Sequence, residues 1–441
     1  MASCYFYMAF VPVYILILGF TIIVDYYAGI YIEKSEGRRR KLFLVCSLIA
    51  NIGVLAVFKY FNFLNENFTV LLSSLSLNNP VPFLKILLPI GLSFHTFQAM
   101  SYTIEVYRGN QKAERNFGIY ALYVMYYPQL VAGPIERPQN ILHQFYEKHD
   151  FDTNRVTAGL RQMLWGFFKK IVVADRLALY VDAVYNNPHQ HSGVSIIVAT
   201  IFFSFQIYCD FSAYSDIALG CAKVMGITLM RNFKRPYFAK NIQEFWSRWH
   251  ISLSTWFRDY LYIPLGGNRV SKAKWYRNIF IVFLISGLWH GANWTYIIWG
   301  GLHGVYQIVE SVGRSHLKPI KNDTVRRVSN FFKIIANFFL VAVAWVFFRA
   351  NTVNDAFYMI KSMFILKPGH LFLGRPPTIF GYAFFAIILL LAIEIPQEYF
   401  PNLQVLNNSR RAIRYAGYFF LIICILLIGV LNGGQFIYFQ F

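Results

Sequence analysis

The chain has 441 residues, of which 56% are hydrophobic, 19% aromatic and 14% charged, and its formal net charge is +20. A soluble domain carries about 25% charged residues, so this composition excludes a soluble enzyme, a disordered chain and a fibrous protein. The basic residues lie in short runs between apolar stretches. That pattern is typical of a polytopic helical membrane protein and not of a nucleic-acid-binding protein.

The apolar stretches predict an all-α integral membrane protein with about ten or eleven transmembrane helices, because about 20 apolar residues cross the hydrocarbon. The expected spans cover residues 9–32, 42–63, 83–105, 156–185, 194–221, 278–311 (two passes broken near Gly291), 331–348, 378–396 and 412–431. Stretches 117–135 and 242–265 are apolar but interrupted by Pro, Gly and charge, which predicts re-entrant or interfacial pieces. The mixed stretch 350–377 predicts an outer amphipathic helix. Residues 1–441 are expected to form one transmembrane domain, with a catalytic core at about 85–312.

The loops rich in Lys and Arg predict the orientation of the chain in the membrane. The basic loops, expected on the cytoplasmic side, are 38–41, 108–115, 223–240, 269–277, 314–333 and 410–414. Loops 64–82 and 186–193 contain no Lys or Arg and are expected outside. The alternation places both ends of the chain outside. No signal peptide begins the sequence. An outside start is what a lost upstream span would leave, so the alternation also predicts that a further span precedes Met1.

The run 245–260 holds a histidine among tryptophans and arginines. A single helix over this run would place His250 on one face with Trp246, Leu253, Ser254 and Phe257. One interpretation is an interfacial helix with a tryptophan belt and arginines that meet lipid phosphates. The other is a functional site around His250.

A second histidine, His290, follows the apolar run 279–285 and therefore lies at membrane depth. Gly287 and Gly291 permit close helix packing and a break just after the histidine, which favours a side chain that reaches a cavity. The ordinary pKa of histidine suits general-base catalysis. A hydrogen-bonded core histidine is the alternative for His290, and it is the preferred interpretation for His303 in its glycine-rich segment.

Two carboxylates, Asp210 and Asp216, fall within one apolar span, where ionisable groups are costly. They are expected to support a site by lining a polar cavity, by pairing with arginines or by holding the tautomer of a histidine. The spacing of the histidines matches no metal motif, so no metal site is predicted.

Together these segments resemble the membrane-bound O-acyltransferase family. The resemblance runs from about Asp25 to the final segment 436–441, and its markers are Leu-Pro-Ile-Gly-Leu-Ser-Phe at 88–94, Tyr-Pro-Gln-Leu-Val-Ala-Gly-Pro-Ile at 127–135 and the two histidine segments. His290 matches the family's Trp-His-Gly histidine, and His250 matches its second polar residue some 40 positions earlier (290 − 250 = 40).

Segment 248–268, ending in Tyr-Ile-Pro-Leu-Gly-Gly-Asn, resembles the bacterial branch of the family that O-acetylates alginate. The related D-alanyl transferases of teichoic acids typically lack that ending. His95 stands where the resemblance implies an aromatic residue.

The resemblance implies a bacterial inner-membrane enzyme that moves an acyl group, expected to be acetyl, from a cytoplasmic thioester such as acetyl-CoA to hydroxyls of an extracytoplasmic polysaccharide. Its expected partner is an extracytoplasmic, esterase-like (SGNH-type) acetyltransferase, and no cofactor is expected to stay bound. His290 would be the general base and His250 would orient the thioester or polarise its carbonyl. The expected supporting residues are Trp249, Trp289, Asp210, Asp216, Arg258 and Asn293, and the expected phosphate ligands are Arg248, Arg269 and Lys274.

Three alternatives stay open. The first is a transporter or channel for acyl groups or polysaccharide, with the histidines as a proton relay. The second is a scaffold that only docks an extracytoplasmic transferase, and the third is transfer of D-alanyl groups or transfer to peptidoglycan.

Overall fold

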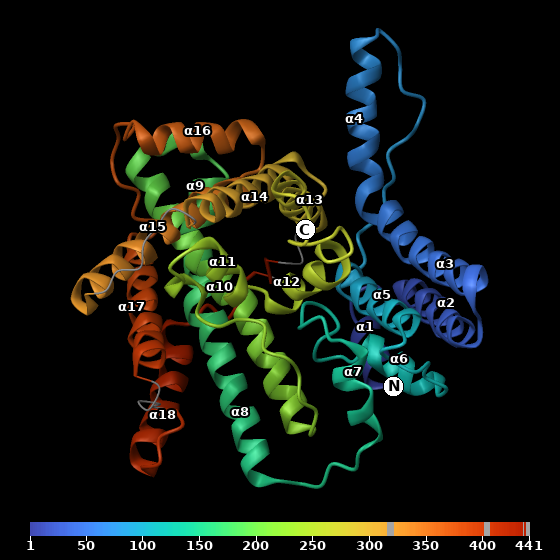
Figure 1. Ribbon diagram of the computed structural model, residues 1–441. Helices are drawn as coiled ribbons and strands as arrows, with labels where there is room; N and C mark the ends of the chain where they lie inside the picture. Colours follow the sequence, from blue (N-terminus) through green and yellow to red (C-terminus); the bar gives the residue numbers. More distant parts are fainter. Residues whose placement is uncertain (315–321, 401–405, 435, 438–441) are drawn as a thin grey trace. The chain divides into compact units, whose positions relative to one another are not determined.

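The computed structural model describes residues 1–314, 322–400, 406–434 and 436–437, and the regular elements within these ranges are helices (Figure 1). This confirms the all-α prediction. Contacts divide the chain into two compact units, which are described separately: Met1–Gly159 with Ala218–Met230, and Leu160–Ile217 with Arg231–Phe441. The expected single domain stays a prediction. Part of the expected inner loop 314–333 and the last four residues lie outside the described residues.

Six helices in the described part of the chain are long and apolar enough to cross a membrane, and each matches an expected span. They are Pro12–Lys34, Gly37–Ser74, Gly193–Val224, Asp323–Arg349, Thr378–Tyr399 and Arg411–Ile428. The other expected passes are helical over most of their length, and their crossing of the membrane stays a prediction.

The first unit is built mainly on three helices that lie side by side, α2, α3 and α5 (Figure 1). Its helices are α1 (Ala2–Met8), α2 (Ile15–Lys34), α3 (Gly37–Leu55), α4 (Phe61–Ser74), α5 (Leu92–Arg108), α6 (Phe117–Met125) and α7 (Pro138–Ile141). The buried carboxylate of Asp25 accepts hydrogen bonds from Ser47 Oγ at 2.6 Å and Asn51 Nδ2 at 2.8 Å. Ser47 also bonds Thr103 on α5, so one polar cluster links the three helices inside an apolar core.

Two expected boundaries in this unit are wrong. The expected loop 64–82 is helical as far as Ser74, because α4 continues from α3 through a short π-helical segment. The expected span 83–105 becomes helical only at Leu92. Gly91 precedes it with φ +74°, and a Cβ there would lie 2.6 Å from the backbone oxygen of Leu130. This left-handed, tightly packed glycine stops the helix from starting earlier.

The second unit holds the helices that position both candidate histidines. They are α8 (Thr153–Phe167, whose first turns belong to the first unit), a π-helical segment (Phe168–Ala174), α9 (Asp175–Tyr185), α10 (Gly193–Val224, whose last turns belong to the first unit), α11 (Ile242–Arg248), α12 (Ile251–Phe257), α13 (Lys272–His290), α14 (Trp294–Arg314), α15 (Asp323–Arg349), α16 (Val353–Phe364), α17 (Thr378–Tyr399) and α18 (Arg411–Ile428). Helix α16 confirms that the stretch 350–377 contains a helix.

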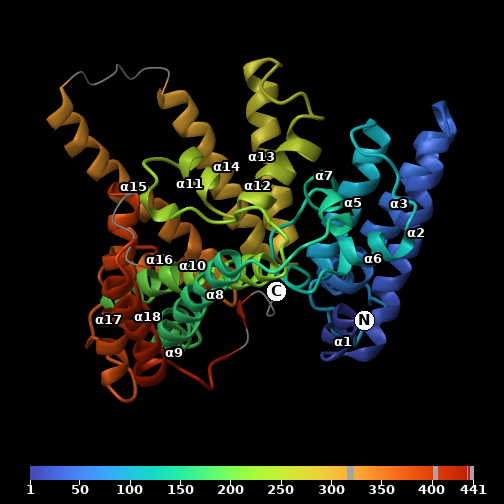
Figure 2. The ribbon, with the colours of Figure 1, turned by 90° about the horizontal axis from the view of Figure 1, so that it is seen from below.

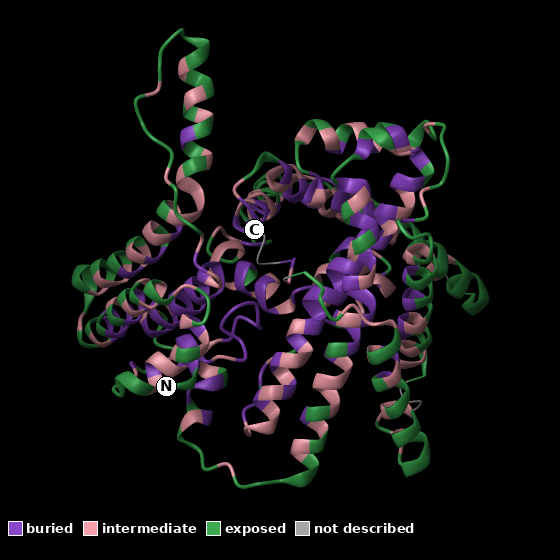
Figure 3. Cartoon of the chain, turned by 180° about the vertical axis from the view of Figure 1, so that it is seen from behind, coloured by how far each residue is buried: buried purple, intermediate pink, exposed green. Residues whose placement is uncertain are grey.

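Figure 3 shows buried residues along the middle of α10 and exposed residues along α17 and α18. The exposed side chains there include Phe384 and Leu427, as a lipid-facing surface requires.

The break predicted near Gly291 is confirmed, since α13 ends at His290 and α14 begins at Trp294. The two helices lie against each other (Figure 2), and glycines allow their close approach. A Cβ at Gly287 would lie 2.3 Å from the backbone oxygen of Tyr296, and one at Gly300 would lie 2.3 Å from that of Phe283. Backbone packs directly on backbone at this crossing.

We expect Gly287→Ala to lower the free energy of unfolding by about 1–3 kcal/mol, because the added methyl group meets rigid backbone. Thermal unfolding of the purified protein in detergent, followed by size-exclusion chromatography, measures the change. Gly301→Ala is the matched control, since its nearest neighbour would be 3.6 Å away at the Leu284 side chain. Equal melting temperatures for the two variants would contradict this account of the crossing.

Candidate active site

His290 ends α13 inside a wall of aromatic rings. Its ring lies 5.0 Å from both Trp289 and Trp299 and 5.5 Å from Phe348, measured between centroids. The side chain is only 4% exposed. The next residue must be glycine, because a Cβ at Gly291 would lie 2.1 Å from the ring of Tyr296. The glycine therefore lets the chain turn away directly after His290 and leaves this imidazole at the end of a helix.

His250 lies at a sharp bend between α11 and α12, with φ +43°. The expectation of one helix over 245–260 is therefore wrong. The bend is held by Asn232: its backbone oxygen accepts from the Ile251 N–H at 2.9 Å, and its Oδ1 accepts from the N–H and Oγ of Ser252. These bonds offset the cost of left-handed backbone at a non-glycine residue.

Asn232 also sets the tautomer of His250. The Nδ1 atom of His250 lies 3.2 Å from Asn232 Oδ1, an amide oxygen that can only accept. Nδ1 therefore carries the proton of the neutral ring, and Nε2 becomes an acceptor. Asn232 itself is anchored by donating from Nδ2 to Ser215 Oγ at 3.4 Å, which connects the bend to α10.

The two histidines come together from segments 40 residues apart. Their ring centroids are 6.4 Å apart, and His250 also lies 6.2 Å from Trp289 and 4.6 Å from Phe211. His250 is fully buried. Two imidazoles thus share one water-poor aromatic surrounding, which is an arrangement suited to positioned proton transfer.

An apolar pocket of about 120 Å³ lies one helical turn from both histidines. Ser286 precedes His290 by four residues on α13, and Ser254 follows His250 by four on α12; both line the pocket. Its other lining residues are Trp246, Leu253, Phe257, Val282 and Phe283. The residues predicted to share a face of the run 245–260 with His250 all line this pocket: Trp246, Leu253, Ser254 and Phe257. They face the same pocket although the helix bends at His250.

His303 has the structural role expected from its sequence context. It is fully buried, and its Nδ1 accepts from Trp246 Nε1 at 3.3 Å. Its ring stacks on Phe245 and Phe283. The bond to Trp246 joins α14 to α11 and so supports the wall of the pocket.

The two expected carboxylates pair with lysines and not with arginines or a histidine. Asp216 lies 2.6 Å from Lys169, and Asp210 lies 2.6 Å from Lys170. Lys169 also lies over the ring of Trp165, and Lys170 reaches Asp175 at 2.8 Å. These pairs fasten the π-helical segment after α8 to α10.

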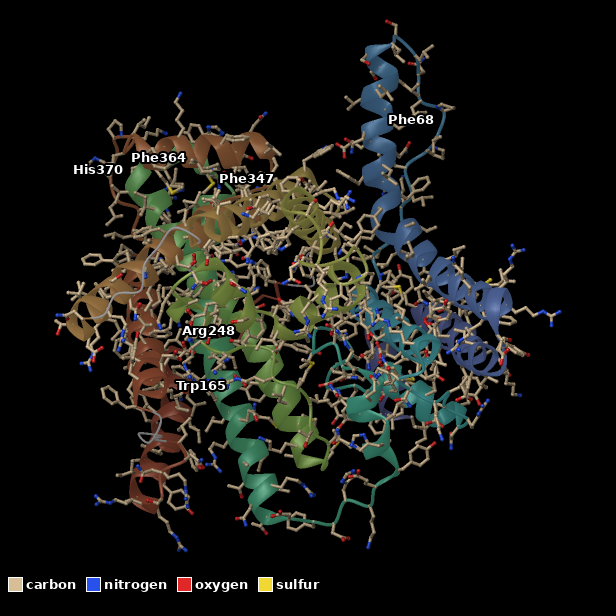
Figure 4. All side chains as sticks on the ribbon, viewed as in Figure 1. Phe68, Trp165, Arg248, Phe347, Phe364 and His370 are labelled. Atoms are coloured by element: carbon tan, nitrogen blue, oxygen red, sulfur yellow. The ribbon has the colours of Figure 1, made fainter. Side chains whose placement is uncertain are left out.

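Of the expected phosphate ligands, Arg248 is already engaged. Its guanidinium bonds Glu398 and Glu244, each at 2.7 Å (Figure 4), and Glu398 also pairs with Arg235. Arg269 and Lys274 are exposed and lie in and just after the turn that contains Gly266 and Gly267. The expected role in phosphate binding therefore fits Arg269 and Lys274 better than Arg248.

The remaining expected supporting residues, Trp249, Asn293 and Arg258, have three different structural roles. Trp249 is fully buried and stacks on Phe245, with Trp345 on another side, so it packs the core beside His250. Asn293 caps α14 by accepting from the Thr295 N–H at 3.0 Å, at the break that follows His290. Arg258 is exposed and pairs with its neighbour Asp259, and no described contact connects it to the histidines.

The model of the membrane-bound O-acyltransferase family matches residues 59–350, which include both histidines. This chain belongs to that family. It is 39% identical over 366 residues to the probable alginate O-acetylase AlgI of Pseudomonas aeruginosa, covering 82% of this chain and 68% of the relative. It is 36% identical over 390 residues to the peptidoglycan O-acetyltransferase of Helicobacter pylori, covering 82% and 72%.

A more distant relative is the teichoic acid D-alanyltransferase of Bacillus subtilis, 26% identical over 275 residues, covering 59% of this chain and 69% of the relative. The match spans about two thirds of the length of the alginate relative. The protein is a multi-pass membrane acyltransferase.

Sequence reasoning missed several residues that hold the candidate site together. Lys169 and Lys170 had a signal, because two adjacent lysines inside an apolar stretch are costly unless carboxylates face them. Asn232 had none, since it precedes the run 245–260 in a basic loop and meets His250 only through the fold. Glu398 lies two residues beyond the expected span 378–396, and its pairing with Arg248 depends on the contact between distant segments.

Asn232→Leu is expected to reduce the rate of acyl transfer by about 10- to 100-fold, because it removes the acceptor that orients His250. Ser215→Ala is the matched control: it removes only the long bond to Asn232 Nδ2 and leaves Oδ1 in place. Turnover per folded molecule, with kcat separated from KM, measures the effect. A loss confined to the amount of folded protein, with kcat unchanged, would contradict the positioning role.

Proposed function

We propose that this protein is an O-acetyltransferase of the bacterial inner membrane that moves acetyl from cytoplasmic acetyl-CoA toward hydroxyls of an extracytoplasmic polysaccharide. The observation that carries the proposal is the convergence of His250 and His290, at 6.4 Å, in a buried aromatic surrounding. The relatives named as an alginate O-acetylase and a peptidoglycan O-acetyltransferase support an O-acetyl product on a glycan.

His290 is the general base in this mechanism. It takes the proton of the acceptor hydroxyl while the hydroxyl oxygen attacks the thioester carbonyl, so that the new C–O bond forms and the C–S bond breaks. The proton then passes to the departing thiolate and leaves as the thiol of coenzyme A. The reaction needs no further proton source, and base assistance contributes about 10²–10⁴-fold to the rate.

His250 orients the donor. Because Asn232 holds the proton of His250 on Nδ1, Nε2 accepts hydrogen bonds. Such a ring suits an amide N–H of the pantetheine arm of acetyl-CoA. It does not suit polarisation of the thioester carbonyl, which needs a donor, so the orienting role is the one that the hydrogen bonds support.

The nucleotide end of the donor is proposed to meet Arg269 and Lys274 at the cytoplasmic face. Both side chains are exposed and lie in or near the turn made by Gly266 and Gly267, whose positive φ values favour glycine. Asn278 holds this turn by donating to the Leu265 backbone oxygen at 2.9 Å. Guanidinium and ammonium groups are the usual phosphate ligands.

The acceptor side is proposed to include an extracytoplasmic, esterase-like (SGNH-type) transferase that completes the modification. Transfer of D-alanyl groups is the weaker alternative, since the D-alanyl relative is 26% identical where the alginate relative is 39% identical.

His290→Ala is expected to abolish transfer of radiolabelled acetyl from acetyl-CoA in membranes that contain the extracytoplasmic partner, while the protein still inserts. The loss should be at least about 100-fold, because the base is removed. His143→Ala is the matched control, since His143 is an exposed histidine of the first unit.

Near-normal transfer by His290→Ala would exclude the base role. Acetyl movement across the membrane without covalent transfer would indicate a transporter. Full activity with complex formation intact would indicate a scaffold.

The double variant Arg269→Gln with Lys274→Gln should raise the KM for acetyl-CoA several-fold and leave kcat nearly unchanged. Lost charge weakens phosphate binding without touching the histidines. Acetyl-pantetheine, which lacks the nucleotide, should show no such change in KM. Arg326→Gln, in another basic segment, serves as the control, and an equal effect on both donors would contradict the phosphate role.

A further inference from the structure

A second cavity in the same unit, of about 130 Å³, is polar and charged where the first is apolar. It lies between α9, α10, the end of α15 and the described residues of 430–434 and 437, and neither His250 nor His290 lines it. The mechanism above does not use it. Its side chains include the buried groups Lys170 and Asp210, which have to be satisfied inside the protein.

The charges of this cavity are already paired. Lys170 lies 2.6 Å from Asp210 and 2.8 Å from Asp175, and Arg349 lies 2.6 Å from Asp182. Three carboxylates thus face two cations, and both cations have carboxylate partners. An anionic group entering here would meet an excess of negative charge and no spare cation.

Gln206 supplies a buried acceptor that has no partner in the described part of the chain. It is 7% exposed, it lines the cavity, and its Oε1 has no hydrogen-bond partner among the residues that the structure describes. A buried carbonyl oxygen is normally hydrogen-bonded, and Oε1 can only accept. The missing partner is therefore a donor, such as a hydroxyl group. Asn432, across the cavity, adds a second amide.

The end of α15 contributes one residue to the surroundings of His290 and the next residue to this cavity. Phe348 packs on the ring of His290 at 5.5 Å, and the following residue, Arg349, lines the cavity. Asp182 lies four residues before the loop 186–193, and Arg349 ends α15. In the orientation predicted by the basic loops, both positions are near the extracytoplasmic face.

We propose that this cavity binds one hydroxyl-rich sugar unit of the acceptor glycan, which enters with uncharged hydroxyl groups. The hydroxyls donate to Gln206 Oε1 and to the paired carboxylates and accept from Asn432 and Arg349. The assignment of the sugar as acceptor rests on the proposed function, whereas the binding itself does not. The site gives this acyltransferase its own contact with the glycan.

The test is isothermal titration of the full chain in lipid nanodiscs with two probes, the neutral tetrasaccharide of N-acetylglucosamine and the anionic tetrasaccharide of mannuronate. We expect saturable binding of the neutral probe and weaker binding of the anionic one. Gln206→Leu should weaken neutral binding by about tenfold, the effect of one buried hydrogen bond. It should not change the melting temperature, because Oε1 bonds none of the described residues.

Gln190→Leu is the matched control, since Gln190 is an exposed glutamine within the outer loop 186–193 and outside the cavity. Asn432→Ala is a second cavity variant and should weaken binding if Gln206→Leu fails to fold. No saturable binding of the neutral probe, tighter binding of the anionic one, or unchanged binding by the cavity variants overturns the inference.

His290→Ala separates this inference from the proposed function. The variant should bind the neutral probe like the wild type. Sugar binding without any acetyl transfer by the wild type would remove the proposed function and leave the cavity assignment. Acetyl transfer by the wild type with no sugar binding would overturn the cavity assignment and leave the proposed function.

Discussion

The hydrogen bonds of Asn232 are the constraint on which the geometry of the site depends. One amide oxygen accepts from the Ser252 N–H, Ser252 Oγ and His250 Nδ1, and the backbone oxygen of the same residue accepts from Ile251. Without these bonds the run 245–260 has no reason to bend at His250, because its sequence is compatible with a continuous helix. The bend turns His250 toward His290 and fixes which nitrogen of His250 can accept.

His290 is positioned differently from His250, by glycines, which lack side chains. Gly287 and Gly300 bring α13 and α14 into backbone contact, and Gly291 makes room for the ring of Tyr296. Close packing of this kind leaves His290 at a helix end with aromatic rings around it. The hydrogen bonds of Asn232 and the glycines of α13 and α14 therefore bring His250 and His290 together in one site. Neither is sufficient by itself.

The sequence alone predicts those features that depend on local pattern. The apolar runs indicate the six long helices, the Trp-His-Gly segment indicates the break after His290, and the costly carboxylates indicate Asp210 and Asp216. What it could not predict depends on contacts between distant segments. The bend at His250 requires Asn232, 18 residues earlier, and the lysine partners of the two aspartates come from another helix.

Those lysine pairs explain how the aspartates affect the site without touching a histidine. Lys169, held by Asp216, lies 5.8 Å from the ring centroid of Tyr208 on α10. Tyr208 packs on Trp249, the residue directly before His250. Loss of the Asp216 charge would leave the buried ammonium of Lys169 without its carboxylate partner, which costs more than the pair contributes. We therefore propose that the aspartates are positioning residues, which fix α10 and so the aromatic side chains that form one wall behind the bend.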